Sequence, residues 1–182
     1  MTDKPRMPPP SLQASASRSL TIDSIAFAKA GKRQDGNDDT ASMFRLHDVL
    51  ADQPASLDWS VAGNQTVDAN GTGKQWLQLR GQLKAAMPCA RCLGAVPVNV
   101  ALDRRFLMAQ DETIAAKLDG ESDDYDVLVA SRHFALADLL EDEALMALPN
   151  FVVHADCQPV AIDDDKLESP FAALAQWRDK KS

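Results

Sequence analysis

The stretch from Trp76 to Phe106 reads WLQLRGQLKAAMPCARCLGAVPVNVALDRRF and decides the fold of the chain. Apolar and polar side chains alternate over Trp76–Leu83 and again over Val96–Phe106, which is typical of half-buried strands. Pro88, two cysteines and Gly94 lie between these runs and favour a tight connection. We therefore predict a β-hairpin that carries a Cys-x-x-Cys motif at its turn.

Further strands are predicted on both sides of this hairpin. Side chains also alternate over Leu57–Val61 and Tyr125–Ala130, and a turn is expected at 70–73, where Asn70, Gly71 and Gly73 occur. Residues 151–154 read as a short apolar strand. We expect the strand at Leu57–Val61 and the two strands of the hairpin to form an antiparallel meander, because their polar positions suit one solvated face.

Two helices complete the predicted fold. The first runs from about Ile22 to Ala30, with Thr21 or Asp23 as its cap and Gly31 as its end. The second spans Ala135–Leu148 before Pro149. Its apolar residues recur at helical spacing, at Leu136, Leu139, Leu140, Ala144 and Ala147. The fold class that follows is α+β, an antiparallel β-rich meander or partly open barrel with an N-terminal helix and a long helix near residues 135–148.

The remaining segments set the expected domain boundaries. We expect residues 1–19 to be a disordered tail, residues 20–160 to form a single domain, and residues 161–182 to be an acidic linker with a short docking helix. The apolar residues of that helix are Phe171, Leu174 and Trp177, which follow Pro170. Within the domain, residues 31–40 have turn chemistry and predict a flexible loop, and residues 44–50 suit either a short strand or one helical turn.

Composition and charge exclude several classes of protein. The sequence has no secretory signal and no apolar run of the roughly 18–20 residues that span a membrane, so a soluble, cytoplasmic protein is expected. The net charge of -8 argues against non-specific coating of nucleic acid. The charge is nevertheless segregated. Six basic residues oppose one acid between Lys74 and Arg105, whereas seven acids oppose one lysine between Asp111 and Asp126.

The three cysteines are the sharpest local signal. Cys89 and Cys92 can reach one ion from a tight turn, as in zinc knuckles. His154 and Cys157 have the same separation, so a chain folded back on itself could complete a tetrahedral Cys3His site for a structural zinc ion. Two alternatives remain. One is that the cysteines are unlinked buried thiols, and the other is that Cys89 and Cys92 form a redox pair, although no thioredoxin-like βαβ pattern surrounds them.

The basic segment is a candidate RNA-binding surface. Lys84, Arg91, Arg104 and Arg105 can contact phosphates, and Trp76 or Phe106 can stack on bases if either ring is exposed. The alternative is that these charged residues only make the solvent-exposed face of an antiparallel sheet soluble.

Acidic residues on the long helix are a candidate protein-binding site. Glu141, Asp142 and Glu143 suit either a solvated face or a cognate protein. Glu143 lies at the edge of the apolar stripe, where its carboxylate needs a hydrogen-bonded or charged partner. Phosphate-loop, dinucleotide-binding, hydrolase and zinc-protease motifs are all missing from the sequence, so we do not expect an enzyme.

Four motifs, taken in order, resemble the YceD family of large ribosomal RNA subunit accumulation proteins. They are Cys89-Ala-Arg-Cys92-Leu93, Leu139–Glu143 with Ala147-Leu148-Pro149, His154–Cys157, and Pro170-Phe171-Ala-Ala-Leu174. The resemblance implies a β-rich α+β domain without known enzymatic activity, and a role in accumulation or processing of 23S ribosomal RNA in bacteria. It also implies Cys89, Cys92 and Cys157 as metal ligands, with His154 as a further candidate.

Two functional hypotheses follow from these observations. The first is an RNA-binding or ribosome-assembly module whose partner is 23S ribosomal RNA or a large-subunit precursor. The second is an acidic adaptor or chaperone that binds a basic ribosomal protein through residues 111–126 and the acids of the long helix. A metal-dependent hydrolase ranks last, because four protein ligands would close the metal site.

Overall fold

The computed structural model describes residues 20–68, 71–120 and 124–157 of the 182-residue chain. The expected disordered tail at residues 1–19 and the expected acidic linker and docking helix at residues 161–182 lie outside the described residues, as does Asn70 of the predicted turn. Among the helices of the described segments, none is both long enough and apolar enough to cross a membrane.

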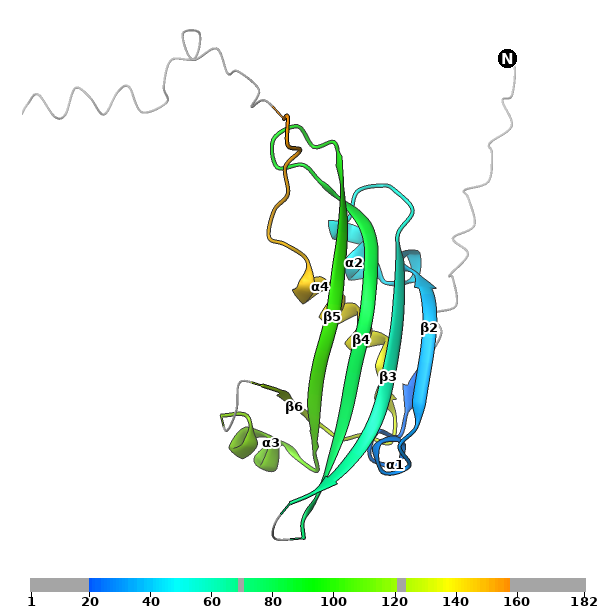
Figure 1. Ribbon diagram of the computed structural model, residues 1–182, viewed down its shortest axis with the longest axis vertical. Coiled ribbons are helices and arrows are strands. Elements are labelled where there is room, and N and C mark those ends of the chain that lie inside the picture. The colour runs from blue at the N-terminus through cyan, green and yellow to red at the C-terminus, as the bar shows by residue number, and fades with distance from the viewer. Residues whose placement is uncertain (1–19, 69–70, 121–123, 158–182) are drawn as a thin grey trace, which may run out of the picture.

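The described chain is an α+β fold built on one five-stranded sheet (Figure 1). In chain order the elements are β1 (Thr21–Ile22), α1 (Ser24–Lys29), β2 (Arg33–Asp39), the 3-10 turn η1 (Thr40–Ser42), α2 (Phe44–Val49), β3 (Ser56–Val67), β4 (Gly73–Pro88), β5 (Ala95–Ala109), α3 (Glu112–Leu118), β6 (Asp126–Val129), β7 (Phe134–Ala135) and α4 (Leu136–Ala147). The large sheet has the order β2-β3-β4-β5-β6, and β1 pairs with β7 in a separate two-stranded sheet.

The predicted antiparallel meander is confirmed in β3 to β5, β2 extends it at one edge, and the sheet is open rather than closed into a barrel. The central hairpin is long, because β4 and β5 stay paired from Trp76 opposite Leu107 to Pro88 opposite Ala95. Its turn therefore lies at one end of the molecule. The last strand, β6, departs from the meander, because it follows α3 and pairs parallel to β5.

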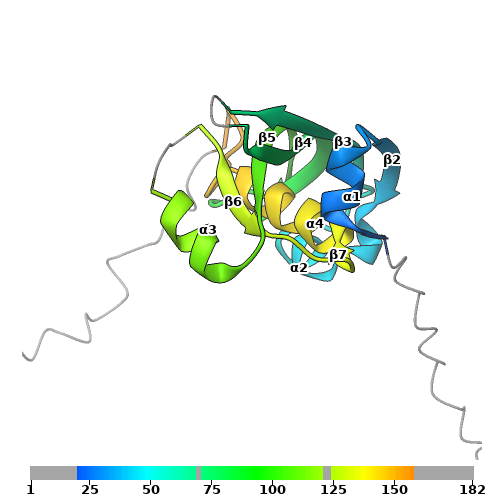
Figure 2. The same cartoon turned by 90° about the horizontal axis from the view of Figure 1, so that it is seen from below.

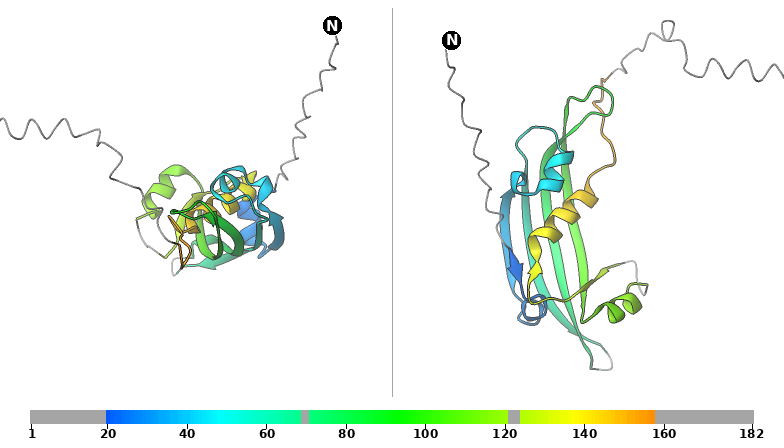
Figure 3. Two further views of the ribbon diagram at one scale, coloured as in Figure 1. Left: turned by 90° about the horizontal axis from the view of Figure 1, so that it is seen from above. Right: turned by 180° about the vertical axis from the view of Figure 1, so that it is seen from behind.

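The helices α2 and α4 pack on one face of the sheet, which we call the inner face (Figures 2 and 3). Alternate residues of β4 and β5 point to this face, among them Leu79, Leu83 and Phe106, which are fully or almost fully buried. They join a core with Leu136, Leu139, Leu140 and Ala144 of α4. The predicted long helix and its apolar stripe are thus confirmed. The opposite, outer face of β4 and β5 is mainly polar in its middle part, at Gln78, Arg80, Gln82 and Lys84 of β4 and at Asn99, Asp103 and Arg105 of β5.

The segment predicted as a flexible loop at residues 31–40 is instead largely the edge strand β2, so that prediction was wrong. Gly36 lies opposite Trp59, and a Cβ atom at Gly36 would come within 2.6 Å of the indole ring. Trp59 also donates a hydrogen bond from Nε1 to the Asp38 carboxylate (2.6 Å). The glycine therefore makes room for an aromatic ring instead of forming a turn.

Smaller differences concern the ends of the fold. The N-terminal helix forms with Asp23, one of the two predicted caps, but it begins at Ser24 because Ile22 belongs to β1. Residues 44–49 take the helical option as α2. The helix α3, which the sequence patterns did not reveal, begins after Asp111, whose side chain accepts a hydrogen bond from the Ile114 amide (2.8 Å). The apolar strand expected at residues 151–154 was wrong in extent, because only Val152 forms a single β-bridge, with Cys89.

Candidate metal centre and the surrounding charges

The turn between β4 and β5 presents the first two candidate ligands. The Cys89 amide donates to the Gly94 carbonyl (2.8 Å), and the Leu93 amide donates to the Cys89 carbonyl (2.9 Å). Leu93 adopts a positive φ of 62°, which closes the tight turn. Within it, Cys89 is buried and Cys92 is exposed. The hairpin therefore fixes one thiol inside and one thiol at the rim.

The segment after α4 brings the other two ligands to the same turn. It runs back beside the end of the hairpin, where the Ala90 amide donates to the Val152 carbonyl (2.8 Å; Figure 1). The Cys157 amide then donates to the His154 carbonyl (3.2 Å), which forms a second small turn. Two short turns, far apart in sequence, thus face each other at one end of the sheet.

The four candidate ligands converge on one point. The ligand atoms of Cys89, Cys92, His154 and Cys157 all lie within 4.8 Å of one another. The sulfurs of Cys89 and Cys157 are 3.7 Å apart, and the Cys92 sulfur is 3.5 Å from His154 Nδ1. Tetrahedral zinc, with Zn–S near 2.3 Å and Zn–N near 2.05 Å, places two sulfurs about 3.8 Å apart and a sulfur and a nitrogen about 3.5 Å apart. The spacing therefore fits a zinc ion, and the cluster can hold such a metal.

A second layer of contacts orients the ligands. His154 Nε2 lies 3.1 Å from the Ala95 carbonyl oxygen, so a proton on Nε2 is donated there and the Nδ1 lone pair is left for a metal. The Arg91 amide donates to the Cys89 sulfur (3.4 Å), and the Arg91 guanidinium donates to the Cys157 carbonyl (2.6 Å). Arg91 therefore links the two turns as well as facing solvent.

The thiols differ in acidity before any metal binds. Burial alone would raise the pKa of Cys89, but hydrogen bonds from the backbone amides of Arg91, Cys92 and His154 outweigh it and lower that pKa to about 5. Burial, together with the neighbouring Cys92 and Cys89 sulfurs, raises the pKa of Cys157 to about 11. Cys89 is thus the preformed thiolate of the cluster. A metal that binds Cys157 must displace its proton, as metal sites with several thiolates require.

Four protein ligands leave a tetrahedral metal without an open position, so the arrangement suits a structural site and not a catalytic one. Such a site would tie residues 152–157 to the end of the hairpin.

The four basic residues predicted to contact RNA do not share one surface. Lys84 and Arg105 lie on the outer face of the sheet, whereas Arg91 lies at the hairpin turn. Arg104 points to the inner face, where it forms ion pairs with Asp126 (2.7 Å) and with Glu143 of α4 (3.1 Å). Lys84 and Arg105 therefore share the outer face but lie six positions apart along the hairpin, and Arg91 lies at its end.

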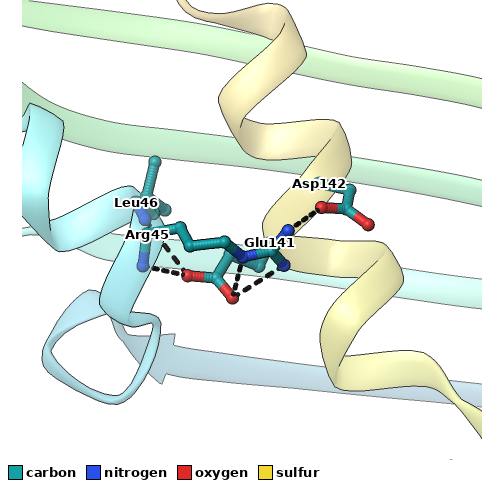
Figure 4. Close-up of polar contacts among 4 residues, drawn as sticks. All are labelled: Arg45, Leu46, Glu141 and Asp142. Carbon is teal, nitrogen blue, oxygen red and sulfur yellow. Dashed lines mark hydrogen bonds and ion pairs between the residues drawn. The ribbon is translucent and has the colours of Figure 1, made fainter.

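The three predicted acids Glu141, Asp142 and Glu143 of α4 all have partners within the chain, and Figure 4 shows those of Glu141 and Asp142. Glu141 accepts hydrogen bonds from the backbone amides of Arg45 (2.7 Å) and Leu46 (3.1 Å), and it also binds the Arg45 guanidinium together with Asp142. Glu143 is buried against Arg104, which is the charged partner that its position required. Burial raises the pKa of Glu143, and the coulombic effect of Arg104 opposes that rise.

One cluster on the outer face was not predicted from the sequence. Trp76 and Phe106, proposed as stacking rings, are both buried. The Arg105 guanidinium lies over the Trp76 ring, 4.2 Å from its centroid, and Tyr125 meets the same ring edge-on at 5.0 Å. Only the strand register brings these three residues together, so no local pattern could have revealed them.

Comparison with known proteins supports the family assignment. The family model described as large ribosomal RNA subunit accumulation protein YceD matches residues 77–176, which are 100 of the 182 residues. No curated protein and no solved structure matches the chain. The matched range contains most of the central hairpin, all of α4 and all four candidate ligands. Since the match spans more than half of its length, the chain belongs to the YceD family of large ribosomal RNA subunit accumulation proteins.

Proposed function

We propose that this protein is a non-enzymatic, cytoplasmic factor that supports accumulation or processing of 23S ribosomal RNA, and so large-subunit biogenesis, by contacting the RNA directly. The family description itself implies a role in accumulation of large-subunit ribosomal RNA. The observation that carries direct contact is the position of Arg80, Lys84 and Arg105, which share the outer face of one hairpin whose turn presents Arg91.

The charges on this face are available to phosphates. The Arg80–Asp103 and Lys84–Asp58 pairs are long, at 3.5 and 3.9 Å, and their side chains are more than half exposed. Exposed pairs of this kind contribute little, so exchanging the carboxylate for a phosphate costs little. Within the described residues, neither Arg91 nor Arg105 has a carboxylate partner. The whole chain is acidic, so we expect weak, salt-dependent binding rather than non-specific coating.

A structural zinc ion would support this surface. Arg91 lies between two ligands of the Cys3His cluster and donates to the carbonyl of a third. Zinc at the cluster would therefore hold the Arg91 guanidinium at the end of the basic face. Metal removal should therefore weaken RNA binding by no more than the loss of the Arg91 contact does.

The direct test is the affinity for 23S ribosomal RNA fragments measured over a series of salt concentrations. Lys84→Gln and Arg105→Gln should each weaken binding and lower the slope of log K against log salt by about 0.7–0.9 for each phosphate that is no longer neutralised. Lys29→Gln in α1 removes the same charge from an exposed lysine of a helix outside this hairpin, and it should bind like the wild type. Absence of RNA association at low salt would refute direct contact.

The alternative is an acidic adaptor or chaperone for a basic ribosomal protein. The observation that favours it is the exposed acidic surface of α3, which includes Glu112 and Asp119, because Glu141, Asp142 and Glu143 already face arginines within the chain. Reversing Glu112 and Asp119 to lysine should then slow association with that ribosomal protein. Unchanged association rates would remove this alternative.

A further inference from the structure

An arginine, rather than an aromatic ring, is the accessible stacking surface on the outer face of the sheet. Trp76 has only 7% of its surface exposed and donates from Nε1 to Thr66 Oγ1 (2.8 Å), which fixes the ring. Arg105 covers this fixed ring with its guanidinium, and Tyr125 braces the ring from the edge. The aromatic ring therefore positions the planar guanidinium of an exposed residue.

The hydrogen-bonding capacity of the Arg105 guanidinium is unused by the rest of the described chain. Contact with Trp76 is the one interaction of this side chain there, since the guanidinium makes no hydrogen bond or ion pair with a described residue. By contrast, the neighbouring Arg104 has two carboxylate partners. A guanidinium that is held by stacking alone keeps its N–H donors and its outward side for a ligand.

A cavity of about 290 Å³ opens beside this guanidinium. Its lining includes Arg80, Arg105 and Tyr125 together with the Asp103 carboxylate and the ion pair of Arg104 with Asp126. Carboxylates repel a phosphate but accept hydrogen bonds from the amino groups of nucleobases. The mixture of an arginine plane, an aromatic edge and acceptors therefore suits a base better than a phosphate.

We propose that this cavity receives an unpaired base of single-stranded RNA, which stacks on the outward side of the Arg105 guanidinium while flanking phosphates contact Arg80 and Lys84. This inference rests on the RNA binding proposed above and names the form of RNA that the same face selects. Bases splayed from single strands stack on arginine planes, whereas paired bases offer no free face.

The test compares three labelled RNAs by fluorescence anisotropy with the full chain. They are a single strand, the same strand with abasic sites, and a duplex. The wild type should bind the intact single strand roughly tenfold more tightly than the abasic strand, as one stacked base allows. Arg105→Lys keeps the charge and loses the planar group, so this preference should disappear while the salt dependence stays unchanged. Arg132→Lys, at an exposed arginine outside the hairpin and this cavity, is the matched control and should keep the preference.

Equal affinity of the wild type for intact and abasic strands would overturn the base site while leaving phosphate contacts in place. Retention of the full preference by Arg105→Lys would overturn the role of the arginine plane. If the wild type bound none of the three RNAs at low salt, the proposed function would fail together with the site. Far-ultraviolet circular dichroism of Arg105→Lys, which should match the wild type, shows that the variant is folded.

Discussion

The sulfur of Cys89 lies 3.7 Å from the sulfur of Cys157, although 68 positions separate the two residues in the sequence. This separation is close to the edge of a zinc–thiolate tetrahedron, about 3.8 Å. Cys92 and His154 complete the group from the same two turns. The fold thus delivers four ligands from two distant segments.

Cys89→Ser should abolish metal binding and loosen the segment that the cluster ties down. Cys89 is the buried thiolate of the group, and a serine hydroxyl is a poor replacement for a zinc ligand. We expect metal content near zero and a loss of at least about 2 kcal/mol in the free energy of unfolding. Elemental analysis and urea denaturation measure the two effects. Ala90→Ser in the same turn is the control, and full stability of metal-free Cys89→Ser would show plain thiol burial instead.

Glu141→Ala should destabilise the fold more than Asp142→Ala. Glu141 satisfies two backbone amides at the start of α2, whereas Asp142 makes one ion pair with Arg45 and is half exposed. We expect a cost of about 1–3 kcal/mol for Glu141→Ala and of about 0–1 kcal/mol for Asp142→Ala, both from urea denaturation. Equal losses of stability in the two variants would mean that the Glu141 carboxylate acts only through its charge.

Gly36→Ala should destabilise the protein by about 1–3 kcal/mol, because the new methyl group would overlap the Trp59 ring. The tryptophan and its hydrogen bond to Asp38 would have to move, so the near-ultraviolet dichroism should also change. Gly120→Ala is the matched control, since nothing lies within 4 Å of its added carbon. If Gly36→Ala were as stable as Gly120→Ala, the Trp59 ring could not lie against Gly36.

Stability should depend on pH through Glu143. Its pKa is raised in the folded state by burial, against the opposing effect of Arg104. The folded state therefore favours the protonated carboxyl. Its contribution to the free energy of unfolding is complete at pH values below the pKa of Glu143 in the unfolded chain, and it is lost as the pH rises through the pKa in the folded chain. Glu143→Gln should flatten this part of the curve of unfolding free energy against pH, and the variant should be at least as stable as the wild type at pH 7. Urea denaturation from pH 4 to 8 measures it, and a steeper curve for the variant would contradict the assignment.

The sequence predicted the elements whose signals are local. Alternation marked β3, β4 and β5, helical spacing marked α4, and the equal spacing of the two ligand pairs marked the candidate cluster. The strand β2 escaped prediction because its residues RQDGNDD are almost all polar, as an exposed edge strand permits. Its place in the sheet depends on Trp59, which is 23 residues from Gly36.

Contacts fixed by register or packing were also beyond the sequence. Arg105 covers Trp76 because β4 and β5 pair in a particular register, and Glu141 caps α2 across 96 positions. The same holds for Arg104, whose spacing suited an RNA contact but whose strand position directs it toward Glu143. Residue type and periodicity indicate which groups are charged, whereas only the fold shows which charges are already matched.

The metal content of the anaerobically purified full-length chain is the most direct test of the central claim that four ligands form one structural site. The ligand geometry predicts close to one zinc ion per chain in the wild type and in Ala90→Ser, and close to none in Cys89→Ser. A folded wild-type chain that holds no metal, even after incubation with excess zinc under reducing conditions, would contradict it.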